Sequence, residues 1–168
     1  MDDGLPLGTC LTLFRRWLTE IREDHQITLH GDETGSNTPN ATFLTWTDWD
    51  LSVCLEYECK RKQLRKPECL NTWIDIKTVY KAFFNRKSIG LSGAMKELGL
   101  VFEGREHSGI EDARNTARLV WRMVEAGCPL TITTRMDERS RPTALTAHRL
   151  DSAIWCLGAL LRFIFQEV

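Results

Sequence analysis

Residues 104–116 read Gly-Arg-Glu-His-Ser-Gly-Ile-Glu-Asp-Ala-Arg-Asn-Thr and pass from a glycine-containing loop into a helix. His107 lies in the loop, and Asp112 lies in the first turn of the expected helix. In many phosphodiester hydrolysis reactions a histidine takes a proton from the attacking water while carboxylates bind divalent metal ions. The stretch therefore indicates a general base at His107 and a metal ligand at Asp112. Taken singly, each has a simpler explanation, as a solvated loop histidine or as an acid that suits the helix dipole.

Apolar spacing after this motif predicts a helix over 110–125 that ends before Gly127. Its expected packing face consists of the apolar side chains Ala113, Ala117, Val120, Trp121 and Val124. Such a helix must cover a sheet or another helix, so the motif indicates a layered domain.

Helices and strands alternate along the rest of the sequence. Apolar residues recur at helical intervals over 7–21, and the β-branched and aromatic stretch 41–46 is typical of a buried strand. The other expected elements are a polar loop over 30–40, a helix that buries Leu51, Cys54, Leu55 and Cys59, a strand or helix entry at 73–76, a short helix over 91–98 and a strand at 131–133. This alternation predicts an α/β layer fold.

Two aspartates follow the strand expected at 41–46. A carboxylate at the C-terminal end of a strand faces the crevice in which α/β folds bind ligands. Asp50 fits this place, and Asp48 shares its face if the extended conformation continues. The alternative is that either aspartate caps the following helix, and position alone favours that alternative. In combination with His107 and Asp112, however, Asp50 becomes a candidate metal ligand.

A basic cluster follows the helix that contains these cysteines: Lys60, Arg61, Lys62, Arg65 and Lys66. The net charge of the chain is -1, so it has no general attraction for nucleic acid. Any binding of phosphates must depend on a local patch such as this one. A solvated helix end explains the cluster equally well.

Six cysteines are irregularly spaced and include no Cys-x-x-Cys pair. Reduced, partly buried thiols of an intracellular protein explain this distribution. A zinc site at Cys54, Cys59 and Cys69 is an alternative, but its spacing does not match a common zinc finger. No secretory signal pattern is recognisable at the N-terminus, where Asp2 and Asp3 replace the usual basic residues. We expect an intracellular location, without distinction between nucleus and cytoplasm.

The chain has 168 residues, the size of a single domain, and its 27% charged and 42% hydrophobic content is typical of a globular protein. The stretch 135–149 is polar and without periodicity, so we expect a linker. The segment 153–165 is strongly apolar except for Arg162. It is shorter than the roughly 20 residues that span a bilayer, and membrane contact is not expected. Packing on the domain is the first expectation for it, before a surface anchor or an unfolded appendage.

Three stretches identify a family: Trp46-Thr47-Asp48-Trp49-Asp50-Leu51, Cys54-Leu55-Glu56-Tyr57-Glu58-Cys59-Lys60-Arg61-Lys62, and the residues from Arg105 to Thr116. They closely resemble the Eri-type 3'–5' exoribonucleases, in particular the branch of the second vertebrate paralogue. This family is part of the DEDDh exonuclease superfamily. The resemblance extends over residues 5–134.

The resemblance implies a fold, a reaction and a set of residues. The fold is the RNase H-like exonuclease fold, and the reaction is two-metal hydrolysis at the 3' ends of RNA or other single-stranded nucleic acid, with Mg²⁺ or Mn²⁺ as cofactor. By resemblance, Asp50 and Asp112 are metal ligands and His107 is the general base. No obligate protein partner is expected.

One departure from the family pattern concerns its first motif, an Asp-x-Glu on the opening strand. This sequence contains no Asp-x-Glu. We therefore expect a partial exonuclease domain over 1–134 that lacks the opening strands of the sheet, followed by a tail over 135–168 outside the family. The predicted function is a 3'–5' exonuclease with an incomplete metal site. The alternative is a catalytically inactive nucleic-acid-binding module or a truncated isoform, which would bind phosphates through Lys60, Arg61 and Lys62.

Overall fold

The structure is a computed structural model that describes residues 4–29, 40–87 and 90–136. The expected loop over 30–40 lies almost wholly outside the described residues, and so do the linker from residue 137 onward and the apolar segment 153–165. No helix within the described ranges is both long enough and apolar enough to cross a membrane.

A three-stranded sheet forms the centre of the domain. Its order is β1 (Phe43–Thr45), β2 (Thr72–Asp75) and β3 (Thr134–Arg135). β1 and β2 are parallel, with Phe43 opposite Trp73 and Leu44 opposite Ile74, whereas β3 runs antiparallel to β2. The strand expected at 41–46 is confirmed. The stretch 73–76 contains both alternatives, because β2 ends at Asp75 and a helix begins at Ile76.

One helix precedes β1, and the other described helices lie between the strands. The expected helices over 7–21, 91–98 and 110–125 are all present, with the first extending to His25. In chain order the helices are α1 (Leu7–His25), the π-helical η1 (Trp49–Cys54), α2 (Leu55–Arg61), the 3₁₀ turn η2 (Glu68–Asn71), α3 (Ile76–Phe84), α4 (Leu91–Glu97) and α5 (Gly109–Glu125). Leu51, Cys54, Leu55 and Cys59 are each about 2% exposed, so the face predicted for η1 and α2 is confirmed.

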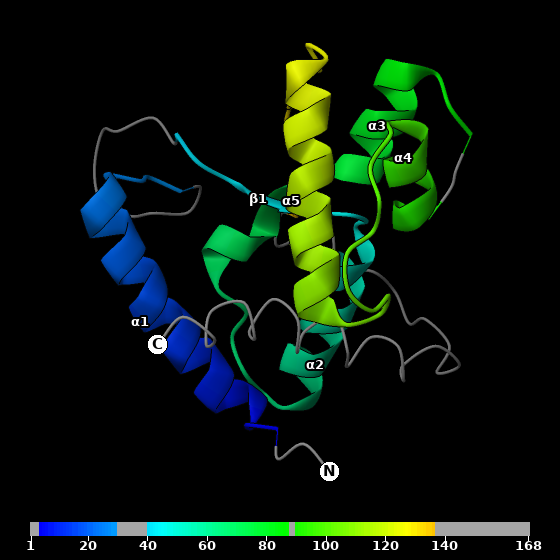
Figure 1. Cartoon of the computed structure of the whole chain (residues 1–168). Coiled ribbons are helices and arrows are strands. Elements are labelled where there is room, and N and C mark those ends of the chain that lie inside the picture. The colour runs from blue at the N-terminus through cyan, green and yellow to red at the C-terminus, as the bar shows by residue number, and fades with distance from the viewer. Residues whose placement is uncertain (1–3, 30–39, 88–89, 137–168) are drawn as a thin grey trace.

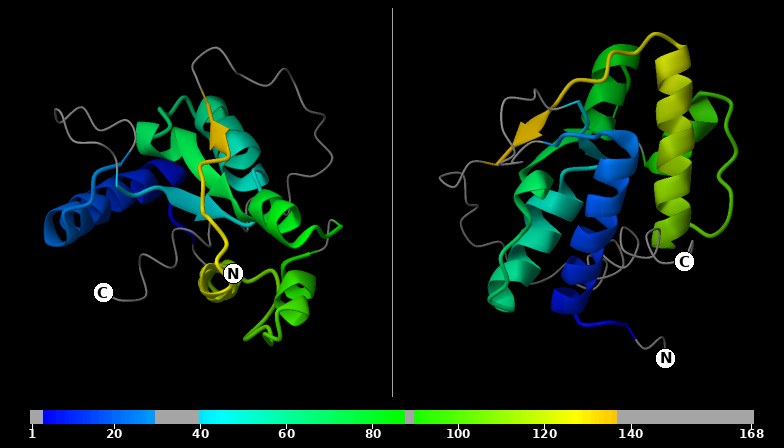
Figure 2. Two further views of the ribbon diagram at one scale, coloured as in Figure 1. Left: turned by 90° about the horizontal axis from the view of Figure 1, so that it is seen from above. Right: turned by 90° about the vertical axis from the view of Figure 1, so that its left-hand side faces the viewer.

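Alternation along β1 and β2 divides the core into two layers. Phe43 and Trp73 point to one side, where they pack with α1, Leu55 and Leu70. Leu44 and Ile74 point to the other side, where they pack with α3, α4 and α5. Figure 1 and the two views of Figure 2 show α5 on one side of the sheet and α1 and α2 on the other. The mixed α/β layers confirm the α/β fold class that the sequence predicts.

The packing face of α5 differs from the prediction. Trp121 is 69% exposed and Val124 is 46% exposed, whereas Leu119 and Met123 are completely buried. The helix is rotated because it buries polar residues as well, with Asn115 and Thr116 on its inner side. A pattern that counts only apolar residues assigns such positions to the solvent.

The third strand also lies later in the chain than the predicted strand at 131–133. Its position is set by Thr133, whose Oγ1 accepts a hydrogen bond of 2.7 Å from the backbone N–H of Asp75. Arg135, which the sequence suggested for the linker, pairs with Thr72, and the Met136 N–H donates to the carbonyl of Asn71 at 2.8 Å. The division of the chain at 134/135 stays a prediction, although the sheet includes Arg135.

A substitution at Phe14 tests how much the core layer between α1 and the sheet contributes to stability. Phe14 is 1% exposed and its ring lies 5.9 Å from that of Phe43. Phe14→Ala is expected to lower the free energy of unfolding by about 3–5 kcal/mol, because it removes a buried ring and leaves a cavity. Urea unfolding followed by circular dichroism measures this loss. Val101→Ala is the control, since Val101 is 76% exposed and should change stability by less than about 0.5 kcal/mol. Equal losses for both variants would contradict the assigned core.

Candidate active site

Asp50 lies in the first turn of η1, just beyond the C-terminal end of β1. A π-helical turn is rare and is often found at functional sites. Burial raises the pKa of the nearby Cys54 thiol to about 12, and the negative charge of Asp50 contributes to the rise. The Asp50 carboxylate is therefore held close to a buried part of the chain, and it also lines a cavity.

Asp48 has a structural role. Its Oδ1 accepts hydrogen bonds of 2.8 Å from the indole N–H of Trp73 in β2 and of 2.8 Å from the hydroxyl of Thr134 in β3. Asp48 occupies the N-cap position of η1, but its side chain makes no capping hydrogen bond. The cap suggested by its position is therefore wrong. Asp48 instead ties the start of η1, and with it Asp50, to the other strands.

Lys66 also fixes this turn. Its side chain is 8% exposed, and its Nζ donates to the carbonyl of Leu51 at 2.7 Å and lies 5.3 Å from the centre of the Trp73 ring. Burial lowers the pKa of the Lys66 ammonium to about 8. Its assignment to the basic surface cluster is therefore wrong, because its ammonium group is buried and bonded to the backbone of η1.

The loop before α5 presents His107 at the surface of the same cavity. Gly104 has φ 82° and His107 has φ 64°, both in the left-handed region. The left-handed φ favours glycine at position 104, whereas the end of the Glu111 side chain, 2.7 Å from where a Cβ would lie, can move aside. A non-glycine residue with positive φ costs energy that neighbouring contacts must offset, and such residues are concentrated at functional sites. The loop conformation thus favours a specific role for His107.

Asn115 holds this loop against α5, and the sequence did not single it out. It is completely buried, and its Nδ2 donates at 2.8 Å to the backbone carbonyls of Glu103 and Glu111. Its Oδ1 accepts from the backbone N–H of Glu103 at 3.1 Å and from Arg118 at 3.0 Å. Asn115 therefore positions the chain that leads to His107. Its only sequence signal is a polar residue on the buried side of a helix.

Asp112 is half-buried in the first turn of α5. Burial raises the pKa of its carboxyl group, while a hydrogen bond from the backbone N–H of His107 and the charge of the His107 side chain oppose that rise. Glu106 and Glu111 add to it. A carboxylate that is partly removed from water and surrounded by other acids gains from a bound cation.

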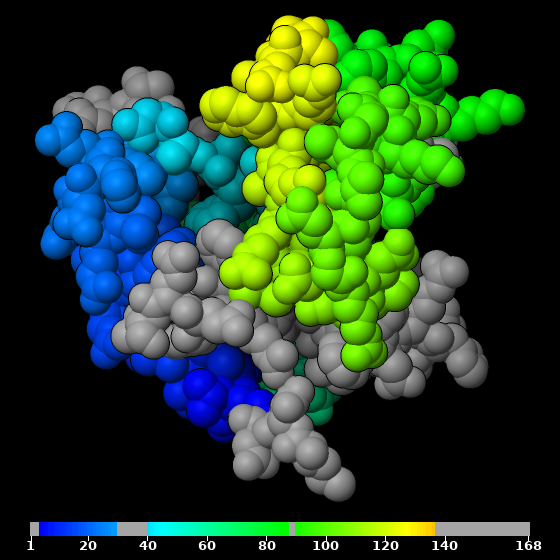
Figure 3. Space-filling view, in the orientation of Figure 1, coloured from blue at the N-terminus to red at the C-terminus, as the bar shows by residue number. Residues whose placement is uncertain are grey.

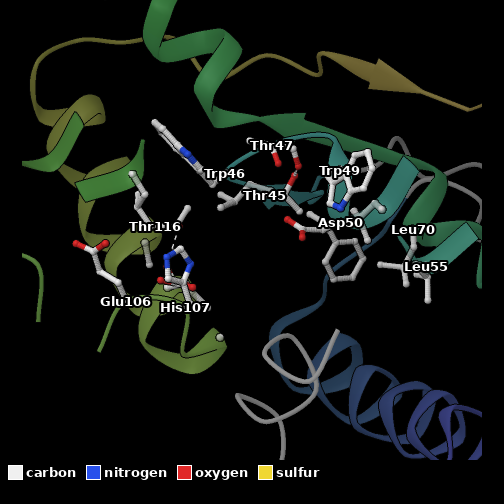
Figure 4. A pocket seen from close by; sticks show the side chains of 18 of the residues that line it. Thr45, Trp46, Thr47, Trp49, Asp50, Leu55, Leu70, Glu106, His107 and Thr116 are labelled. Carbon is white, nitrogen blue, oxygen red and sulfur yellow. Dashed lines mark hydrogen bonds between the residues drawn. The ribbon is translucent and has the colours of Figure 1, made fainter. Parts of the chain in front are cut away.

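A single cavity of about 730 Å³ brings Asp50, His107 and Asp112 together. Figure 4 shows Glu106 and His107 on one wall, with Asp50 and Trp49 on the other and Thr45 from β1 between them. Residues more than fifty positions apart in the sequence thus contribute to one site. The expectation that the strand-end aspartate and the loop motif share a crevice agrees with this placement.

The carboxylates of this cavity suit a hard divalent cation such as Mg²⁺. Asp50 and Asp112 are oxygen donors, and a Mg²⁺ ion is commonly held by one or two carboxylates, with water and phosphate oxygens as its other ligands. Within residues 4–29, 40–87 and 90–136, however, no group of three or more His, Cys, Asp or Glu side chains is arranged to hold a metal. The described residues therefore fit part of a two-metal site.

The basic cluster lies apart from this cavity. Lys60 is paired with Glu56 at 3.3 Å, and Arg61 makes two hydrogen bonds to Glu58 at 3.0 and 2.8 Å. Lys62 is exposed at the C-terminal end of α2. None of these residues lines the cavity. A phosphate contact here would therefore involve nucleic acid that extends beyond the reacting end.

Comparison with known proteins defines the class. A family profile described as Exonuclease matches residues 16–120. This chain belongs to that exonuclease family. The structure agrees, because the nuclease domain of 3'hExo, a DEDDh family member solved with rAMP, superimposes with a TM-score of 0.62 at 25% identity over 74% of this chain and 59% of that one. The cell-death related nuclease CRN-4, at 16% identity and a TM-score of 0.65, shares the fold.

The most informative relatives narrow the class to Eri-type exoribonucleases. The chain is 49% identical over 144 residues to human ERI1 exoribonuclease 2 and 38% identical over 133 residues to the Drosophila melanogaster 3'-5' exonuclease Snipper. These matches include 82% and 79% of this chain but 20% and 47% of the relatives. The resemblance to the Eri-type family is confirmed. The chain spans less than half the length of either relative.

The Asn115 contacts predict a measurable effect on stability. Asn115→Ala should lower the free energy of unfolding by about 1–3 kcal/mol, because the backbone N–H and carbonyl of Glu103 lose the side chain that bonds to them. Glu103→Ala is the matched control. It keeps those backbone groups and removes only a surface ion pair with Arg118, which is worth about 1 kcal/mol or less. Denaturant unfolding of both variants measures the two losses of stability. A larger loss for Glu103→Ala would contradict the role of Asn115 in holding the loop against α5.

Lys66 predicts a pH dependence. Its pKa is lower in the folded protein than in the unfolded chain, so the unfolded chain binds more protons between about pH 8 and pH 10.5. The contribution of Lys66 to stability is therefore least favourable below pH 8 and improves as pH rises through this window. Measured against Lys66→Met, the unfolding free energy of the unmodified chain should increase by on the order of 3 kcal/mol from pH 7.5 to pH 10.5. A difference that is independent of pH would contradict burial of the charged lysine.

Proposed function

We propose that this chain acts on the 3' ends of RNA as a 3'–5' exonuclease, with Asp50, His107 and Asp112 in its active site. The observation that carries the proposal is their convergence on one cavity at the C-terminal end of β1. In α/β folds this end of the sheet is where ligands bind. Membership of the exonuclease family makes phosphodiester hydrolysis the reaction that suits these residues.

His107 is proposed as the general base. Its left-handed backbone and the hydrogen bonds of Asn115 to the preceding loop hold it at the rim of the cavity, where a water molecule and the terminal phosphodiester have access. A neutral imidazole can accept the proton of the attacking water as the new P–O bond forms, while the bond from phosphorus to the 3' oxygen of the preceding nucleotide breaks and that oxygen takes a proton from solvent. The backbone N–H of His107 meanwhile donates to Asp112, which keeps the base beside the proposed metal ligand.

Asp50 and Asp112 are proposed as ligands of Mg²⁺ or Mn²⁺. A divalent ion at this site would polarise the phosphate and stabilise negative charge on its oxygens. The desolvation of Asp112 supports a cation there, since the nearby acids Glu106 and Glu111 increase the negative potential. A second ion would need further donors than these two carboxylates.

RNA is the proposed substrate because of the relatives. One solved neighbour is described as a 3'-exonuclease in specific recognition of the 3' end of histone mRNA stem-loop, with a TM-score of 0.60. In this chain Lys60, Arg61 and Lys62 are proposed to contact phosphates further along the strand, with Lys62 contributing most because Lys60 and Arg61 are engaged by glutamates.

A labelled RNA assay tests the proposal. Single-stranded RNA labelled at its 5' end should be shortened one nucleotide at a time from the 3' end in the presence of Mg²⁺ or Mn²⁺, and a chelator should stop the reaction. His107→Ala should lower the rate by about 10²–10⁴-fold, the usual contribution of a general base. Asp50→Asn and Asp112→Asn should lower the rate and should also raise the metal concentration needed for half of the maximal rate.

Glu125→Gln is the matched control, since Glu125 lies at the far end of α5 and pairs only with Trp121 and Arg122 among the described residues. Its rate should stay within about twofold of the unmodified chain. RNA binding without shortening, by a chain that unfolds cooperatively, would overturn the proposed activity. A rate unaffected by His107→Ala would assign the activity to another protein in the preparation.

A further inference from the structure

The stretch from Ile76 to Lys96 carries a local excess of positive charge. It contains four lysines, one arginine and no acid, whereas the whole chain has a net charge of -1. These residues form α3 and most of α4, together with the connection between them. Figure 3 shows the surface of the two helices, in green, beside α5. A slightly acidic chain thus presents one strongly basic pair of helices.

The acids that border this stretch are already bonded to neighbouring residues. The carboxylate of Asp75, the N-cap of α3, accepts hydrogen bonds from the backbone N–H and the hydroxyl of Thr78 at 3.1 and 2.8 Å. Glu97, at the end of α4, accepts a hydrogen bond from the hydroxyl of Tyr80 and pairs with Arg86 at 3.6 Å. Among the described residues, neither carboxylate pairs with a lysine.

The four lysines of this stretch, called the α3–α4 lysines below, have no ion-pair partner in the described part of the chain. They are Lys77, which is half-buried, and the exposed residues Lys81, Lys87 and Lys96. The basic cluster that follows α2 differs, because three of its five residues are paired with glutamates and Lys66 is buried. An anion that binds the α3–α4 lysines therefore breaks no existing ion pair.

α3 begins beside the candidate active site. The backbone N–H of its second residue, Lys77, donates to the carbonyl of Trp46 at 3.1 Å, and Trp46 lines the cavity. Leu91 and Ser92, which open α4, line the same cavity. Lys81 lies one turn beyond Lys77 on the same side of α3, because residues four apart on a helix are neighbours. The α3–α4 lysines thus start next to the site and continue away from it along α3, which is about 13 Å long.

We propose that the α3–α4 lysines bind phosphates of the RNA strand that lie on the 5' side of its reacting 3' end. A strand whose last phosphodiester enters the cavity must leave it across neighbouring elements, and α4 lines the cavity while α3 begins beside it. The charged lining of the cavity is mainly acidic, so the phosphates that remain outside need cations elsewhere. The identity of the anion rests on the proposed function, whereas the contact itself requires no cleavage.

RNA binding in the absence of cleavage tests the contact. Single-stranded RNA of about 12 nucleotides, labelled with fluorescein at its 5' end, is titrated with the full chain in the presence of a chelator while its anisotropy is followed. The lysine variant, Lys77→Gln with Lys81→Gln, should raise Kd about 25-fold at 0.1 M salt, because each lost phosphate contact removes a counterion-release factor of about 5 at that concentration. The slope of log Kd against log salt concentration should fall by about 1.4.

Arg16→Gln with Arg122→Gln is the matched control. It removes the same number of positive charges from α1 and α5, where each arginine is paired with a glutamate. Its Kd should stay within about twofold of that of the unmodified chain, because its charges are already neutralised locally. Equal losses for the two double variants, or no RNA binding by the unmodified chain, would overturn the proposal. Equally tight binding of poly-glutamate, lost in the lysine variant, would overturn RNA as the occupant.

Substrate length separates this contact from damage to the site. With Mg²⁺ present, the lysine variant should raise KM for the longer RNA but leave kcat/KM for a dinucleotide within about twofold, since the single phosphodiester of a dinucleotide reacts in the cavity. Equal losses for both substrates would assign the lysines to the site itself and overturn the proposed contact.

The two readouts also distinguish this contact from the proposed function. Lysine-dependent RNA binding by a chain that cleaves no RNA would support the contact and contradict the nuclease activity. Cleavage of RNA with binding unchanged in the lysine variant would support the activity and overturn the contact. Circular dichroism of each variant verifies cooperative unfolding.

Discussion

The carboxylate of Asp48 connects the strands of this small sheet. One of its oxygens accepts hydrogen bonds from Trp73 in β2 and from Thr134 in β3, at 2.8 Å each. Asp48 itself lies where β1 gives way to η1, so these contacts fix the direction in which the chain leaves the sheet. A sheet with strands of only two to four residues has few ladder hydrogen bonds, and side-chain bonds of this kind become correspondingly important. The location of Asp50 depends on this junction.

The other half of the site is fixed in a comparable way. Asn115 bonds to both backbone groups of Glu103 and so holds the loop before His107 against α5. Polar groups buried without partners are costly, whereas a fully bonded side chain such as Asn115 makes the loop conformation specific. Lys66 performs the same task for the turn that contains Asp50, through the carbonyl of Leu51. In this domain, buried polar residues position the candidate active-site residues and the apolar core provides the layers.

The candidate active site combines the residues expected of the exonuclease family with an apolar surface beside β1. The chain has the strand-end aspartate and the histidine–aspartate motif of an Eri-type enzyme, while the cavity beside β1 is also lined by apolar side chains of α1 and α5. Both observations concern the same edge of the sheet. Asp50 and Asp112 lie in the same cavity as these apolar side chains, so the edge of β1 and the candidate active site form one surface.

The sequence by itself determined the local features of this protein. Periodicity predicted the main helices and the central strand, because amphipathic faces leave a direct trace in residue order. The motif from Arg105 to Thr116 predicted the family and the candidate residues His107 and Asp112. Tertiary structure alone decided that Asp48 is structural, that Lys66 is buried and that α5 turns Trp121 outward. Those outcomes depend on contacts such as Asp48 with Thr134, which join residues 86 positions apart, and no local pattern encodes a hydrogen bond over that separation.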